Sequence, residues 1–181
     1  FPLVARAAGL IASIIGILTV KAREDEDPMN ALNRGYYTAA VLAMVGFGAS
    51  AYWLLRTPDF PNAWLSFFLC GILGILMSIA FVFITQYYTE YKYRPVQEIA
   101  KASQTGPATN IITGFAVGLE CTALPVLVIS TAILTSYHLG LATGLSGGGF
   151  FGTAVATMGM LGTAAYILAM DTFGPITDNA G

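Results

Sequence analysis

This chain has 181 residues, a length that would suit one soluble domain, but its composition excludes that class. It is 56% hydrophobic and only 10% charged, whereas soluble domains carry about 25% charged residues. The net charge is −2 and no basic patch with interleaved aromatic residues is present, so nothing indicates nucleic-acid binding, and lipid is the expected surrounding.

Five apolar stretches are long enough to cross a bilayer, whose hydrocarbon layer of about 30 Å needs roughly 20 helical residues. Each stretch is continuous and lacks the strict polar alternation of a barrel strand, so we expect an all-α, polytopic transmembrane helical bundle. In chain order, the expected spans are residues 1–20, 36–55, 64–85, 111–134 and 150–170.

The first span begins at Phe1 without a methionine, carries Arg6 and has no small-residue cleavage site. It does not resemble a signal peptide, and we expect the chain to be a piece of a longer protein. Arg6 lies near one end of the span, where its long side chain is expected to reach the polar interface.

Basic residues are concentrated in two of the four connections between the spans, the first and the third. The first contains Lys21, Arg23 and Arg34, the third contains Lys92, Arg94 and Lys101, the second contains Arg56, and the fourth contains no Lys or Arg. Cytoplasmic loops are enriched in Lys and Arg, so the first and third connections are expected in the cytoplasm. Helix parity then places the end of the fifth span on the cytoplasmic side.

Glu120 lies about ten residues into the fourth expected span. An acid within lipid is costly and usually has a function. Pro125 follows and removes the N–H that would bond the Cys121 carbonyl. Two interpretations stay open: an intramembrane proton or cation site beside a broken turn, or a protonated carboxyl that is hydrogen-bonded between helices in a structural role.

The fifth span is rich in small residues, which include the pairs Gly152/Ala156 and Gly159/Thr163, each four positions apart. Such pairs allow helix backbones to approach closely in lipid. The pattern therefore predicts a helix packed inside protein, either as generic packing or as the lining of a central pathway.

The closing segment, MDTFGPITDNAG, places Asp171 and Asp178 seven residues apart, which is two turns on one face if the helix continues. Pro175 removes one backbone bond between them. Either the segment is an ordinary polar helix end, with Asp178 and Asn179 in a turn or cap, or its oxygens are ligands for a hard cation such as Mg²⁺.

Three segments of the chain resemble known proteins. They are DPMNALNRGYY, the long stretch YYTEYKYRPVQEIAKASQTGPATNIITGFAVGLECTALPVLVIS, and FGTAVATMGMLGTAAYILAMDTFGPITDNAG at the end. Together they are similar to the membrane-integral inorganic pyrophosphatases, which pump H⁺ or Na⁺. The resemblance implies about sixteen transmembrane helices, of which this chain would supply the seventh to the eleventh.

The resemblance also implies the chemistry, which is Mg²⁺-dependent hydrolysis of pyrophosphate coupled to ion transport by a homodimer in a membrane. Asp178 matches the aspartate of the closing motif that takes part in the Mg-pyrophosphate site, Asn179 is adjacent to it, and Asp171 receives no role. The residues that activate water are expected outside this chain, so no catalytic residue is assigned and the isolated segment should be inactive.

Several questions stay open at this point. The transported ion is H⁺ or Na⁺, K⁺ is a candidate activator, and a prokaryotic plasma membrane with the end of the chain in the cytoplasm is the expected location. The alternative function is a non-enzymatic secondary transporter or channel subunit, in which the fifth span and Glu120 would form the substrate path.

Overall fold

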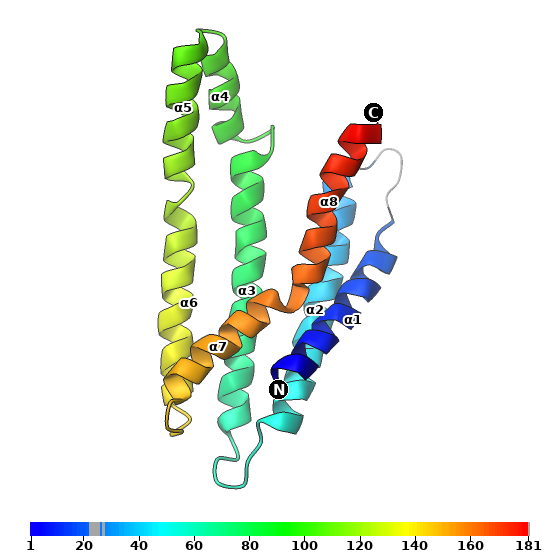
Figure 1. Cartoon of the computed structure of the whole chain (residues 1–181), viewed down its shortest axis with the longest axis vertical. Coiled ribbons are helices and arrows are strands. Elements are labelled where there is room, and N and C mark those ends of the chain that lie inside the picture. Colours follow the sequence, from blue (N-terminus) through cyan, green and yellow to red (C-terminus); the bar gives the residue numbers. More distant parts are fainter. Residues whose placement is uncertain (22–25, 27, 181) are drawn as a thin grey trace. The chain divides into compact units, whose positions relative to one another are not determined.

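The computed structural model describes residues 1–21, 26 and 28–180, and over these residues the chain is helical without any strand (Figure 1). The helices are α1 (Pro2–Thr19), α2 (Pro28–Leu54), α3 (Ala63–Thr89), α4 (Arg94–Ser103), α5 (Pro107–Glu120), α6 (Ala123–Leu141), α7 (Gly148–Met160) and α8 (Ala164–Ala180). A single 3-10 turn, η1 (Leu161–Thr163), separates α7 from α8. The all-α prediction is confirmed.

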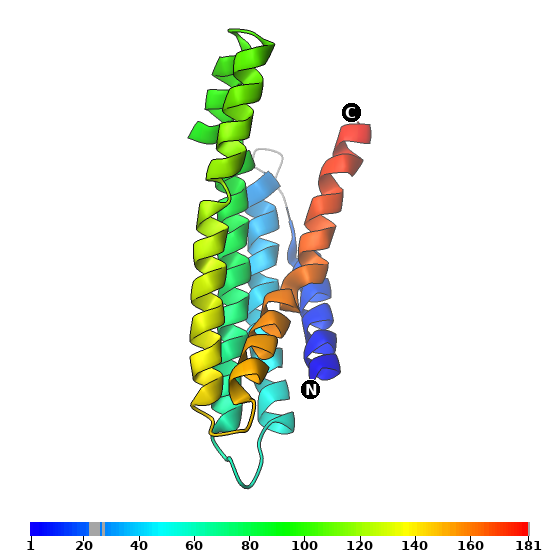
Figure 2. The ribbon, with the colours of Figure 1, turned by 60° about the vertical axis from the view of Figure 1, so that its left-hand side comes forward.

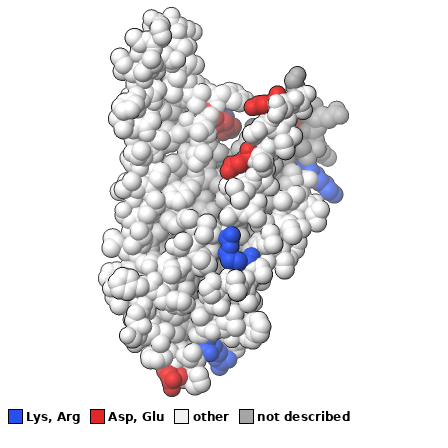
Figure 3. All heavy atoms as spheres, in the orientation of Figure 1, with Lys and Arg blue, Asp and Glu red and all other residues white. Residues whose placement is uncertain are grey.

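Five segments of the described chain are long and apolar enough to cross a membrane, as the sequence predicts. They are Pro2–Thr19, Pro28–Leu54, Ala63–Ser103, Pro107–Leu141 and Gly148–Ala180. Charged side chains occupy only small, scattered areas of the visible face in Figure 3. A surface so poor in charge suits lipid or further protein, but not water.

Four of the five segments extend beyond the expected spans, all but the first, and the fourth is also interrupted. α2 begins at Pro28, eight residues before Tyr36, because a proline is well tolerated in the first turn of a helix and the polar residues after it form helix beyond the apolar run. The fourth span is divided into α5 and α6 by the turn at 121–122, since Pro125 has no N–H to donate to the Cys121 carbonyl.

The chain separates into two compact units, Phe1–Leu76 with Ile133–Gly181, and Met77–Ala132. In the first unit, α1 packs against α2, η1 and α8. The residues that α1 buries are small: Ala5, Gly9, Ala12, Ser13 and Gly16. Small residues allow the helix backbones to approach closely, and close packing replaces the hydrophobic effect as the source of stability between helices in lipid.

Buried aromatic and small apolar side chains of the first unit form one hydrophobic cluster. Phe67 and Phe151 meet edge to face with ring centroids 4.8 Å apart, and Phe1 and Phe47 meet in the same way at 5.4 Å. The cluster consists of Ala5, Phe47, Ala63, Phe67, Cys70, Val155 and Ala156. It fixes the first half of the fifth segment, α7, inside protein.

The second unit contains the helical hairpin of α4 and α5. Gly106 turns the chain between them with φ +129°, a value that residues with a Cβ rarely adopt. The Thr109 hydroxyl bonds the carbonyls of Ala102 and Gly106 at 3.0 and 2.9 Å, which holds the turn closed.

Candidate functional site

The candidate site is the end of α8, which the break at η1 separates from the packed helix α7. Figure 2 shows that α7 and α8 run in different directions on the two sides of this break. The sequence around it contains Gly159 and Gly162, and glycine is a weak helix former. The change of direction leaves α7 packed inside the first unit, whereas α8 continues to the end of the described chain with Tyr166 as its only buried residue.

α8 presents its acids to the outside of the described chain. Asp171, Asp178 and Asn179 are all exposed, and within the described residues their side chains make no hydrogen bond or ion pair. The helix continues through Pro175 to Ala180, so both acids lie on one continuous helix, seven residues apart and therefore on one face. Asp178 and Asn179 thus lie within the helix and not in a turn after it.

The end of α8 lies at the same end of the first unit as the end of α1 and the beginning of α2 (Figure 1). At that end the Arg34 guanidinium bonds the Lys21 carbonyl at 2.8 Å and the Glu26 carboxylate at 3.0 Å. Arg23, most of the acidic run at 24–27 and Gly181 lie outside the described residues. The side of the membrane on which this end of the first unit lies stays a prediction.

The oxygen donors of α8 are chemically suited to Mg²⁺ but do not form a complete site alone. Two carboxylates and one amide are hard oxygen ligands, whereas Mg²⁺ requires six oxygens in octahedral geometry. Across the part of the chain that the structure describes, no three His, Cys, Asp or Glu side chains lie close enough together to hold a metal ion. Phosphate oxygens, water or residues outside this chain would have to complete the coordination.

Glu120 makes an ion pair that sequence reasoning did not predict. Its carboxylate lies 2.5 Å from the Arg94 guanidinium and accepts a hydrogen bond from the Tyr88 hydroxyl at 3.5 Å. Arg94 also pairs with Glu98 at 3.2 Å, one turn along α4. The ion pair joins the end of α5 to the beginning of α4, so the geometry gives Glu120 a structural contact within the hairpin.

The partner of Glu120 could have been found in the sequence. Arg94 begins α4 and Glu120 ends α5, and the two residues are nearly equidistant from the turn at Gly106. In an antiparallel hairpin, residues equidistant from the turn lie opposite each other. The pairing requires knowledge that the fourth span begins with a separate helix, which the continuous apolar run concealed.

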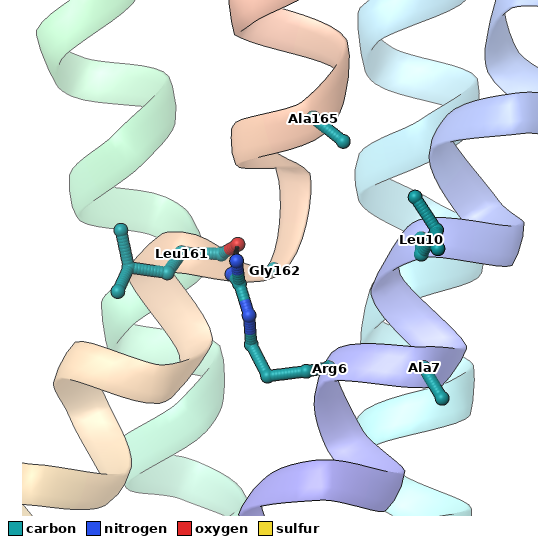
Figure 4. A pocket seen from close by; sticks show the side chains of 6 residues that line it. All are labelled: Arg6, Ala7, Leu10, Leu161, Gly162 and Ala165. Atoms are coloured by element: carbon teal, nitrogen blue, oxygen red, sulfur yellow. Dashed lines mark hydrogen bonds between the residues drawn. The ribbon is translucent and has the colours of Figure 1, made fainter.

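Arg6 contacts the break at η1, a partner that the sequence did not indicate. Its guanidinium donates a hydrogen bond to the Leu161 carbonyl across a pocket of about 290 Å³ (Figure 4). The other residues that line this pocket are Ala7, Leu10, Gly162 and Ala165. The Leu161 carbonyl lies at the break and close to α1, so it is within reach of the Arg6 guanidinium.

Tyr166 makes a second contact that the sequence did not indicate, with the backbone of α2. It lies in the first turn of α8, is 1% exposed, and donates a hydrogen bond to the Leu32 carbonyl of α2 at 2.7 Å. Its hydroxyl occupies the space beside Gly35, where a Cβ would overlap it. A tyrosine in an apolar run gives no signal of such a partner, which lies 134 positions away in the sequence.

Comparison with known proteins covers the whole chain. Residues 1–181 match the family described as "Inorganic H+ pyrophosphatase". The chain is 64% identical over 181 residues to the "K(+)-insensitive pyrophosphate-energized proton pump 2" of Moorella thermoacetica, covering all of this chain and 26% of that protein. It is 54% identical over 194 residues to the "Pyrophosphate-energized membrane proton pump 3" of Arabidopsis thaliana, again over all of this chain and 24% of that protein.

A third relative is of similar length to the chain. It is the "Pyrophosphate-energized proton pump 2" of Mycoplana dimorpha, 41% identical over 194 residues, with all of this chain and 86% of that protein covered. The chain thus spans about a quarter of the length of the Moorella and Arabidopsis relatives and most of the Mycoplana sequence.

Proposed function

This chain belongs to the inorganic H⁺ pyrophosphatase family, and from that membership we propose that it is part of an ion-translocating inorganic pyrophosphatase. The pump would couple Mg²⁺-dependent hydrolysis of pyrophosphate to ion transport across a membrane. The observation that carries the proposal is the match of all 181 residues to the family, with relatives that are named pyrophosphate-energized proton pumps.

Residues 1–181 would form part of the transmembrane pump domain, with the five membrane-spanning segments crossing the bilayer. We propose that the end of α8 faces the cytoplasm. Two observations support this orientation: the basic residues of the first and third connections, and the position of the end of α8 at the same end of the first unit as the beginning of α2.

Asp178 is the proposed Mg-pyrophosphate ligand, and Asn179 would add an amide oxygen beside it. When bound, Mg²⁺ supplies positive charge that neutralises the phosphates and orients them for attack. The role of this chain is to hold the Asp178 carboxylate at the end of α8, exposed and without a competing ion pair among the described residues. Asp171, two turns earlier on the same helix, is kept without an assigned role.

The ion and the assembly are also proposals. The names of the relatives favour H⁺ over Na⁺, and the name of the Moorella relative includes the term K(+)-insensitive, which speaks against K⁺ as an activator. We further propose a homodimer in a prokaryotic plasma membrane. The alternative of a secondary transporter or channel subunit receives no support from the pyrophosphate-energized relatives.

The proposal is tested with Asp178→Ala in the full-length pump that contains this sequence. Loss of an outer-shell partner of a metal site typically costs about 10–100-fold in activity, so loss of a direct ligand should reduce pyrophosphate hydrolysis by at least that factor. Phosphate release from membrane vesicles measures it, with Asp59→Ala as the control, because Asp59 is exposed in the connection between α2 and α3. Unchanged turnover in Asp178→Ala would remove Asp178 from the site.

A further inference from the structure

The break at η1 is held by α1 through two neighbouring contacts. Gly9 packs so closely on Gly162 that a Cβ on Gly9 would overlap the Gly162 carbonyl oxygen. Arg6, three residues before Gly9 and on the same face of α1, donates its guanidinium N–H to the Leu161 carbonyl. The Leu161 carbonyl also accepts the backbone N–H of Ala164, so both of its lone pairs are used at the point where the helix changes direction.

The first turn of α8 is held by α2 through Tyr166. The ring of Tyr166 lies 6.0 Å from that of Tyr36, and the hydroxyl donates to the Leu32 carbonyl at 2.7 Å. The ring is buried, and the hydroxyl fits against Gly35. Arg6 and Tyr166 therefore anchor the two sides of the same break, one to α1 and the other to α2.

Beyond these anchors, the described chain holds α8 very little. Tyr166 is the only buried residue of α8, and residues 171–180 are all exposed. Asp178 is twelve residues beyond Tyr166, a distance of about 18 Å along a helix with a rise of 1.5 Å per residue. A tilt of about 10° at the base would therefore move Asp178 by about 3 Å.

We propose that Arg6 and Tyr166 are positioning residues, which fix the direction of α8 and thereby the position of Asp178 at the Mg-pyrophosphate site. This inference rests on the proposed function. Displacements much smaller than 3 Å matter at such a site, because Mg²⁺ demands near-ideal octahedral geometry with oxygen ligands at about 2.0–2.1 Å. Neither residue touches the metal or the substrate in this scheme, because both act through the base of α8.

The kinetic test uses Tyr166→Phe, Arg6→Met and Arg6→Lys in the full-length pump, with Mg²⁺ titrated at fixed pyrophosphate. Tyr166→Phe and Arg6→Met should each weaken the apparent Mg²⁺ affinity by about 10-fold, the lower range for residues that orient metal ligands, while turnover at saturating Mg²⁺ stays within about twofold. Arg6→Lys retains a donor for the Leu161 carbonyl and should recover most of the affinity. Tyr52→Phe and Arg56→Met are the matched controls, because they remove a similar hydroxyl and guanidinium that bond each other near the far end of α2.

The second test measures the direction of α8 itself. Cysteines introduced as Ile176→Cys in α8 and Val45→Cys in α2, both at exposed positions, carry spin labels that report the distance between the two helices. Cys121 is replaced by serine in this background so that it is not labelled. Tyr166→Phe and Arg6→Met should broaden or shift the distance distribution, whereas Tyr52→Phe should leave it unchanged.

The positioning proposal requires both the weakened Mg²⁺ affinity and the altered distance, and the absence of either overturns it. A loss of turnover with unchanged Mg²⁺ affinity would show that the two residues only stabilise the fold. The positioning proposal and the proposed function can fail independently. If Asp178→Ala abolishes hydrolysis while the Arg6 and Tyr166 variants behave as the parent, only the positioning proposal fails; if Asp178→Ala is silent, the proposed site fails whatever the other variants do.

Discussion

The two halves of the fifth membrane-spanning segment differ in what they contact, although the sequence presents them as one continuous run. α7 buries Gly148, Gly149, Gly152, Val155, Ala156 and Gly159, whereas α8 buries only Tyr166. The first half is defined by packing and the second by two anchors at its base and exposed polar groups at its end. Stability and candidate function are therefore separated along this segment, so substitutions in the two halves should have different effects.

The largest effect on stability is expected for Gly159→Leu in α7. A Cβ at Gly159 would overlap the backbone carbonyl of Gly71 in α3, and backbone atoms cannot rotate away. Overpacking of this kind costs about 3 kcal/mol or more. The matched variant is Gly174→Leu in α8, where no atom from another part of the described chain lies within 4 Å of the added Cβ. Thermal unfolding of the detergent-solubilised pump would measure both, and equal losses would contradict the division of the segment.

An intermediate effect is expected for the stabilisation that Mg²⁺ and pyrophosphate provide. A ligand at 100 times its dissociation constant stabilises the folded protein by about 2.7 kcal/mol. Asp178→Ala should leave the unfolding temperature of the ligand-free pump unchanged, because this side chain is exposed and makes no contact within the described residues, but should remove most of the ligand-induced increase. A lowered unfolding temperature without ligand would show that α8 contributes to stability as α7 does.

The smallest effect is expected for Glu120→Gln in the α4–α5 hairpin. The Arg94–Glu120 pair is about half exposed, with side-chain exposures of 52% and 43%, and exposed ion pairs contribute about 0–1 kcal/mol. Its loss should lower the free energy of unfolding by that amount at most, and less at high salt. Hydrolysis and pumping should be retained. A pump that hydrolyses pyrophosphate but no longer transports ions after this substitution would show that Glu120 belongs to the ion path.

The number and class of the membrane-spanning segments could be predicted from sequence because both depend on apolar length alone. The packed character of α7 was also predictable, since the spacing of Gly152/Ala156 is a local pattern, and burial of both residues confirms it. The point at which this packing ends was not predictable. It ends at Gly162 and Thr163, because the chain changes direction at η1. A change of direction depends on what packs beside the helix, and a hydropathy pattern contains no such information.

The contacts of Arg6, Glu120 and Tyr166 show the limit of sequence reasoning more clearly. Each binds a partner between 26 and 155 positions away, and two of the three partners are backbone carbonyls. A carbonyl is present at every residue, so the sequence does not distinguish the one that is chosen. The assignment of Asp178 as a metal ligand stays a prediction, since the residues that would complete the coordination of Mg²⁺ are expected outside the described chain.

Pro175 lies between Asp171 and Asp178, and α8 continues through it. A proline has no N–H, so the carbonyl of Asp171 lacks its usual partner four residues later. Helices bend more readily at such a turn. The geometry of this turn therefore sets the position of Asp178 relative to Asp171. A small bend there would change the position of the Asp178 carboxylate relative to that of Asp171, while the residues before the proline keep their positions.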